Sequence, residues 1–361
     1  MLHKLPLPAN FFKTPQLTPE RKSSLDKLAR RNARNLVLHA QLSHGPVHWT
    51  LLSEHHGFCI YRGSEVNAAS NLATYCSTIQ VRGTIEEVAA LFNPQTSPPT
   101  APSLERIVPM RFLPTVLDQA TLLTLALPST SQPRHYRGIH WTAFQSPSRI
   151  AKSRDCCFLE THMDAQCDGR RGWVRATTSV EMPECPDLPQ YGLVRMDFQR
   201  CGHVVFESLD RPGYLDVLYM TQVDLKGSVP DFVTELAMRR ICKGLRDLHK
   251  AMSARRLLSQ GTELILHGAR TCAMCATLFV YGADKIHCRF CNHVVCKPCS
   301  THWVLPGLHV NVCKHCAQEK TSAPPSSQPI MDRNVRRSLP SLIPEEDSPR
   351  SEVASRSEVI G

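Results

Sequence analysis

The sequence of 361 residues has no apolar run that approaches the roughly 18 residues a membrane-spanning helix requires. Its N-terminal segment lacks the unbroken apolar stretch of a secretory signal, because Pro6 and Pro8 interrupt it. Neither a G-x-S-x-G nucleophile motif nor a glycine-rich phosphate-binding loop is present. We therefore expect a cytoplasmic protein, at most peripheral on a membrane, and no catalytic residues.

The basic residues are not concentrated in one place, although the formal net charge of +10 favours anionic partners. The densest groups are 27–34 near the N-terminus and Arg333, Arg336 and Arg337 near the C-terminus. Dispersed charge is more typical of a solvated surface than of a binding stripe. We therefore expect no specific nucleic-acid partner.

Cysteine is abundant, and eight of the sixteen cysteines fall into four C-x-x-C pairs near the C-terminus. These pairs are Cys272/Cys275, Cys288/Cys291, Cys296/Cys299 and Cys313/Cys316. A two-residue gap lets one backbone turn present two thiolates to a single ion, and tetrahedral zinc takes four. The four pairs therefore predict two zinc ions.

Metal binding also explains how such a short segment, about 270–318, can fold without a large core. Structural zinc contributes on the order of 10–16 kcal/mol per site. Disulfides are the alternative, but paired C-x-x-C spacing inside the cell favours metal. The other eight cysteines have no ligand spacing, and we interpret them as thiols of a reducing compartment: Cys59, Cys76, Cys156, Cys157, Cys167, Cys185, Cys201 and Cys242.

Helix and strand signals divide the rest of the chain. Thr18-Pro19 predicts a helix start, and Thr84 with Glu87 predicts a capping box. Many short strand candidates lie between 48 and 223, with a turn predicted at Cys201-Gly202 and one strand over 192–199. An apolar stripe then predicts a long helix after Ser228. This order indicates an α+β fold with a mostly antiparallel sheet.

The organisation that follows has five parts. We expect an N-terminal extension with a basic helix (1–45), a sheet domain (46–256), a linker (257–269), a zinc finger (270–318) and a disordered tail (319–361). The tail is assigned from its serine, proline and charge content.

The sheet domain resembles START (lipid-transfer-related) domains. The matching pieces occur in order at 49–61, 81–87, Ser153-Arg-Asp155, 179–186 and 222–230. The resemblance implies a helix-grip fold, in which a curved antiparallel sheet wraps a long C-terminal helix around a lipid-sized cavity. It also implies a non-catalytic protein with a hydrophobic lipid ligand. Arg154 and Asp155 are expected to form a structural ion pair, and Arg154, Asp155, Phe232 and Leu236 are the candidate pocket residues.

The finger resembles FYVE zinc fingers. Its gaps of 2, 12, 2, 4, 2, 13 and 2 residues, and Cys288-Arg289-Phe290-Cys291, carry the likeness. The resemblance implies a cross-brace, in which the first and third pairs hold one zinc and the second and fourth pairs the other. RING and PHD fingers fit less well, because both place a histidine among the ligands.

The residues between the ligands depart from that family. FYVE fingers bind phosphatidylinositol 3-phosphate with an R-R/K-H-H-C-R run, an upstream W-x-x-D and an arginine before the seventh cysteine. Here Asp284 enters the run, Asn311 replaces that arginine, and no tryptophan precedes Cys272 in the linker. Lys285, His287 and Arg289 remain as phosphoinositide candidates, and Tyr281 of Phe279-Val280-Tyr281 is a candidate membrane contact. These departures make recognition of that lipid doubtful.

The leading hypothesis is a non-catalytic lipid-binding or lipid-transfer protein whose finger docks on an endosomal or other membrane, or on a protein. One alternative is a zinc-finger interaction adaptor with a non-functional START scaffold. Another is a ubiquitin ligase that uses the cross-brace as a RING does.

Overall fold

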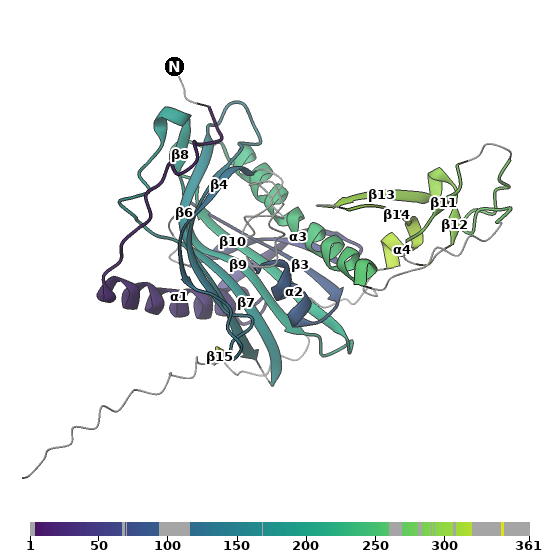
Figure 1. The fold of residues 1–361 in the computed structure, drawn as a ribbon, viewed down its shortest axis with the longest axis horizontal. Helices are drawn as coiled ribbons and strands as arrows, with labels where there is room; N and C mark the ends of the chain where they lie inside the picture. The colour runs from purple at the N-terminus through teal and green to yellow at the C-terminus, as the bar shows by residue number, and fades with distance from the viewer. Residues whose placement is uncertain are drawn as a thin grey trace, which may run out of the picture.

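The computed structural model describes the sheet domain, the finger and a short part of the tail (Figure 1). The described residues are 4–66, 69, 71–93, 116–167, 169–259, 269–280, 284–289, 291, 293–305, 308–319 and 341–342. The predicted disorder of the tail lies almost entirely outside these residues. No described helix is long and apolar enough to cross a membrane.

A large curved sheet forms the centre of the N-terminal region (Figure 1). Its strands are β1 (Val47–His55), β2 (Phe58–Glu65), β3 (Leu72–Arg82), β4 (Val116–Ala126), β5 (Tyr136–Phe144), β6 (Ser153–Cys167), β7 (Arg170–Ser179), β8 (Leu193–Arg195), β9 (Asp197–Glu207), β10 (Tyr214–Asp224) and β15 (Ser341–Leu342). The strands follow the order β1-β2-β3-β10-β9-β7-β6-β5-β4, and β8 and β15 each pair with β6. Only the β6–β8 pair is parallel among the described strands, which confirms the predicted antiparallel sheet.

Two helices cover one face of this sheet. The long α3 (Asp231–Ser259) packs on β2, β3 and β10, and the short α2 (Ile85–Leu91) lies beside it. Thr84 and Glu87 form the predicted capping box at the start of α2. Leu245, Leu248 and Met252 of α3 are buried in the core that the helices share with the sheet. A curved antiparallel sheet on a long C-terminal helix confirms the predicted helix-grip fold.

The opposite face of the sheet is covered by α1 (Pro19–His39), which packs on β6, β7 and β9. Thr18 caps the helix and Pro19 opens it, as the sequence predicts, because proline fits the first helical position, where no backbone donor is needed. Ala33, Leu36 and Val37 are buried against the sheet. The sheet therefore lies between two helical layers.

The turn predicted at Cys201-Gly202 is wrong, since both residues lie inside β9. Gly202 has a φ of 147°, and a Cβ there would lie 1.9 Å from the carbonyl oxygen of Arg175. Glycine is needed for this close approach of β7 and α1, not for a change of direction. The strand predicted over 192–199 is also divided, because β8 ends at Arg195 and β9 begins at Asp197.

The finger is built from short elements at the far end of α3, where β13 lies beside that helix (Figure 1). They are β11 (Ile286–His287), β12 (Val294–Val295), the 3₁₀ helix η3 (Lys297–Cys299), β13 (Ser300–Leu305), β14 (Leu308–Cys313) and α4 (Lys314–Glu319). A second 3₁₀ turn in the sheet domain, η2 (Pro189–Tyr191), precedes β8. The finger has its own small core around Val295, Trp303 and Val312.

Candidate metal centres and ligand cavity

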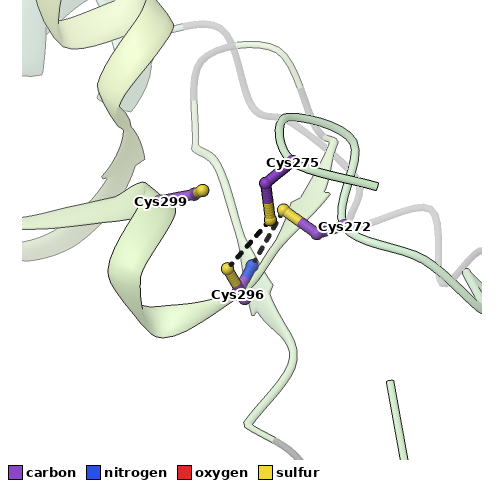
Figure 2. A group of neighbouring side chains, drawn as sticks. All are labelled: Cys272, Cys275, Cys296 and Cys299. Carbon is purple, nitrogen blue, oxygen red and sulfur yellow. Dashed lines mark hydrogen bonds between the residues drawn. The ribbon is translucent and has the colours of Figure 1, made fainter. Parts of the chain in front are cut away.

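The eight finger cysteines form two groups of four. Within each group the sulfur atoms all lie within 4.8 Å of one another. The groups are Cys272, Cys275, Cys296 and Cys299, and Cys288, Cys291, Cys313 and Cys316. Figure 2 shows the first group, in which the Cys272/Cys275 turn and the Cys296/Cys299 segment each present two side chains to one space. The cross-brace pairing of first with third and second with fourth is therefore present.

The sulfur separations fit zinc rather than disulfides. Four sulfurs placed about 2.3 Å from one ion in a tetrahedron lie about 3.8 Å apart. Cys275 Sγ and Cys296 Sγ are 3.6 Å apart, and Cys291 Sγ and Cys313 Sγ are 3.8 Å apart. A disulfide requires about 2.05 Å, and none of the sixteen cysteines, all of which the structure describes, forms one. Each site offers four thiolates to one zinc ion. The two sites therefore accommodate two zinc ions, as predicted.

The backbone also prepares the thiols to bind metal. The amide groups of Met274 and Cys296 donate to Cys272 Sγ at 3.4 Å each. Burial opposes ionisation of Cys272, but these donors and the Cys275 amide outweigh it and lower the pKa of the thiol to about 6. Cys316 N donates to Cys313 Sγ at 3.3 Å in the second site. Amide donors to sulfur stabilise the thiolate form that a metal binds.

Side chains next to the ligands alternate between core and solvent. Phe279 packs on the finger core with the Lys285 ammonium 5.5 Å from its ring centroid. Leu278 and Val280 are 69% and 72% exposed. Tyr281 lies outside the described residues. In the described part of this segment, 277–280, the exposed apolar surface therefore comes from Leu278 and Val280.

The basic candidates of the finger occupy the segment around β11. Lys285 is exposed just before the strand, and His287 and Arg289 are half-buried. The Arg289 amide donates to Asn311 O at 2.9 Å, which brings this run beside β14. Asn311 is exposed, and its side-chain oxygen is 3.0 Å from His302 Nδ1. An amide with a histidine partner thus stands where the phosphate-binding family carries an arginine.

A cavity of about 60 Å³ lies between the N-terminal half of α3 and the sheet. Its lining is mostly apolar and comes from β5, the β5–β6 loop, the start of β6, β9, β10 and α3. On α3 the lining residues are Val233, Ala237, Met238, Arg240 and Ile241. Pockets that bind drug-sized ligands measure about 300–1,000 Å³, so the space in this conformation is small.

Arg154 and Asp155 do not form the expected ion pair, because neighbouring residues of a strand point to opposite faces. Arg154 lines the cavity. Asp155 Oδ2 instead accepts from Trp141 Nε1 at 2.7 Å and from Arg195 Nη2 at 2.9 Å on the other side of β6. Asp155 thus belongs to the structural support of the sheet and not to the cavity.

Phe232 and Leu236 also lie outside the cavity lining, with exposed fractions of 64% and 49%. The α3 face that meets the sheet contains Val233, Ala237 and Ile241 at a spacing of four residues, and Phe232 and Leu236 precede two of these by one position. One position rotates a side chain by about 100° around a helix, which turns this pair to solvent. The apolar stripe in the sequence predicted the helix, but it did not show that Phe232 and Leu236 lie outside its buried face.

A buried polar cluster on the cavity side of the sheet was missed. Arg175 Nη2 donates to Glu160 Oε2 at 2.7 Å, and His162 Nε2 lies 2.7 Å from Glu160 Oε1. Burial opposes the charge of Glu160, but Arg175 and His162 hold its pKa below the ordinary value. His140 lies nearby, and burial lowers its pKa to about 4. The sequence carried one signal for this cluster. Glu160 and His162 follow Cys156 and Phe158 at every second position of the strand, which places all four on the same inward face.

The cluster reaches the cavity through aromatic contacts. The His203 ring centroid lies 4.7 Å from that of Tyr219, which lines the cavity. His203 Nδ1 has no hydrogen-bond partner within the part of the chain that the structure describes, and burial lowers the pKa of this imidazole. Neutral, buried imidazoles thus lie directly behind the apolar wall.

The zinc finger family described as FYVE matches residues 266–322, which contain both cysteine groups. No curated protein matches the chain. Among solved structures, human StAR-related lipid transfer protein 5 is similar at 19% identity, with 65% of this chain and 99% of that chain covered and a TM-score of 0.48. Human STARD10 is similar at 16% identity, with 69% and 84% covered and a TM-score of 0.43. A STAR-related lipid transfer protein from Xanthomonas axonopodis is similar at 17% identity, with 57% and 97% covered and a TM-score of 0.38.

Proposed function

We propose that this protein binds one hydrophobic lipid between α3 and the sheet without chemically changing it, and that its finger docks the complex on a membrane. The observation that carries the proposal is the apolar cavity beneath the N-terminal half of α3. Few residues of that lining are charged, and apolar pockets with few polar groups suit lipid chains.

Ligand entry requires this end of α3 to move away from the sheet, since about 60 Å³ is too small for a lipid chain. Exposed apolar residues lie beside the same region, with Phe232 and Leu236 on α3 and Ile150 in the β5–β6 loop. Insertion of these side chains into a bilayer would favour the opened helix, because it removes apolar surface from water. Lipid uptake is therefore expected to occur at a membrane.

The finger contributes a second membrane contact. Leu278 and Val280 are exposed apolar residues, and Lys285, His287 and Arg289 lie nearby in sequence. Charge-assisted hydrogen bonds contribute about 1.5–3 kcal/mol each, so two missing cationic contacts weaken phosphatidylinositol 3-phosphate binding about a hundredfold or more. The finger is thus proposed as a weak peripheral anchor on endosomal or other membranes.

The adaptor alternative is favoured by one observation, the small volume of the cavity. In this alternative the sheet domain remains empty and the finger binds a protein. The two readings differ in whether lipid is ever retained.

Lipid extraction separates them. The purified full-length protein is incubated with mixed-lipid vesicles, reisolated by gel filtration and extracted for mass spectrometry. We expect one bound lipid per chain with an unaltered mass. A protein that returns without lipid from every mixture would support the adaptor, and a lipid of altered mass would contradict the non-catalytic role.

A further inference from the structure

The charged residues that line the cavity all carry the same sign. They are Lys152, Arg154 and Arg240, and the lining contains no aspartate or glutamate. A cavity that binds a neutral lipid needs no excess of positive charge in its lining. Three cations at the edge of an apolar space instead indicate where a negative charge on the ligand would lie.

Arg154 is the most unusual of the three, because it is only 9% exposed and has no carboxylate partner among the described residues. Its guanidinium donates only to backbone oxygens, to Leu225 O and Lys226 O at 3.1 Å each and to Lys152 O. An arginine carries five N–H donors, so two remain. Burial accordingly lowers the pKa of this side chain.

Nearby acids do not neutralise this group. Asp155 faces the other side of β6, where Arg195 pairs with it. Asp197 and Asp224 both pair with the Lys226 ammonium, at 2.9 Å and 2.8 Å. On α3, Asp231 and Glu235 are not part of the cavity lining, and Glu235 pairs with Arg239.

Lys152 and Arg240 flank the cavity from opposite walls. Lys152 follows the β5–β6 loop, whereas Arg240 lies on α3. Both are exposed, and within the described residues neither has an ion-pair partner. They are therefore available to a ligand group that lies at the cavity edge.

We propose that the ligand is an anionic amphiphile, whose carboxylate or phosphate binds the spare N–H groups of Arg154 while its tail enters the apolar cavity. Lys152 and Arg240 close around the same anion. This inference rests on the proposed lipid-binding function and names the class of lipid. A charge-assisted contact inside a partly desolvated site is stronger than the same contact in water, which gives the head group its selectivity.

Matched ligands test this on the unaltered full-length protein. Oleate is compared with oleyl alcohol, and oleoyl lysophosphatidate with monooleoylglycerol, by native mass spectrometry below their micelle concentrations. Acetate and inorganic phosphate supply the head group alone. We expect each anionic lipid to bind at least about tenfold tighter than its neutral partner, and the head groups alone not to bind.

These measurements distinguish recognition of the anionic head group from lipid binding itself. Equal binding of anionic and neutral partners would overturn the head-group assignment while the lipid-binding function stood. No binding of any of the four lipids would remove both. Binding of acetate or phosphate alone would contradict the need for a tail.

Variants locate the charge without relying on the buried arginine. Arg240→Gln is expected to weaken oleate binding several-fold with no effect on oleyl alcohol, and Lys243→Gln is the control, since Lys243 is exposed on the same helix but does not line the cavity. Arg154→Gln should abolish the preference for oleate. If that variant fails to fold, Lys152→Gln with Arg240→Gln provides the same test on exposed residues, and an unchanged preference there would contradict the assignment.

Discussion

The sheet domain and the finger are stabilised by different means. The sheet domain buries apolar side chains in cores on both faces of one sheet. The finger has one small core, and its two groups of four thiolates supply the metal sites. Side-chain packing tolerates many sequences, whereas a tetrahedral metal site requires particular residues at particular spacing. The comparison explains why one region is easy to interpret from sequence and the other is not.

Loss of a zinc ligand should separate the two regions most strongly. Cys288→Ser removes a ligand from a buried thiolate site, so the finger should unfold at a cost of about 10 kcal/mol or more of metal-dependent stability. The sheet domain should keep its thermal transition in calorimetry. Lys297→Ala, an exposed position between two ligands, is the control. A single shared transition lost in the Cys288 variant would show that the regions fold as one unit.

All eight ligands could be predicted from the sequence. In Cys272/Cys275 and in each of the other three pairs, the two intervening residues fix the backbone turn that presents both thiolates to one ion. The cross-brace pairing came with the family resemblance and not from spacing alone. Candidate recognition residues between the ligands could be named, and they stay predictions, but their geometry could not be predicted. Tyr281 stays a prediction, while Leu278 was missed because only the structure shows which side of the loop is buried.

A substitution in the sheet domain should have the opposite outcome, a less stable sheet domain with an intact finger. Glu160→Gln removes the negative charge that pairs with the buried guanidinium of Arg175, which should cost about 3–5 kcal/mol. Thermal unfolding of the sheet domain should shift down while zinc content, measured by a colorimetric chelator, stays at two ions per chain. Asp247→Asn removes an exposed pair with Lys250 and should change stability by less than about 1 kcal/mol. Equal shifts in the two variants would contradict the burial of the Glu160 cluster.

The antiparallel sheet and the long helix α3 were predictable from the strand pattern and the apolar stripe, whereas the helix-grip arrangement came with the START resemblance. The buried edge of α3 was not, because Phe232 and Val233 are equally apolar and differ only by one helical position. Nor could Arg154 be separated from Asp155, since strand alternation decides their faces only once β6 is paired on both sides. The sequence also could not show how small the cavity is.

Acidification should weaken the sheet domain through a buried histidine. The folded pKa of His140 is about 4 and the ordinary value is 6.5, so the unfolded chain gains the proton first as the pH falls. Stability is thus complete above about pH 6.5 and is lost progressively toward pH 4, by about 2 kcal/mol at pH 5 for this group alone. Urea unfolding at pH 7.5 and at pH 5 measures this loss of stability, and the His140→Gln variant is the comparison. An equal loss in the variant would contradict the assignment to His140.

The smallest expected effect concerns the surface of the finger. Asp284→Arg replaces an exposed negative charge with a positive one next to Lys285, so binding to vesicles with phosphatidylinositol 3-phosphate should rise several-fold. Flotation with vesicles of equal charge made with phosphatidylserine controls for simple attraction. No gain would mean that the missing tryptophan and the residue at Asn311 control recognition, and an equal gain on both vesicles would show simple charge attraction in place of recognition.

The central claim is that one region holds a lipid and the other holds two zinc ions, independently. Native mass spectrometry of the full-length protein, incubated with lipid vesicles and measured before and after chelation, tests both parts. We expect a mass that includes two zinc ions and one lipid, and, after chelation, loss of the zinc with the lipid retained. A chain that never carries lipid, or that releases it together with the zinc, would contradict this account.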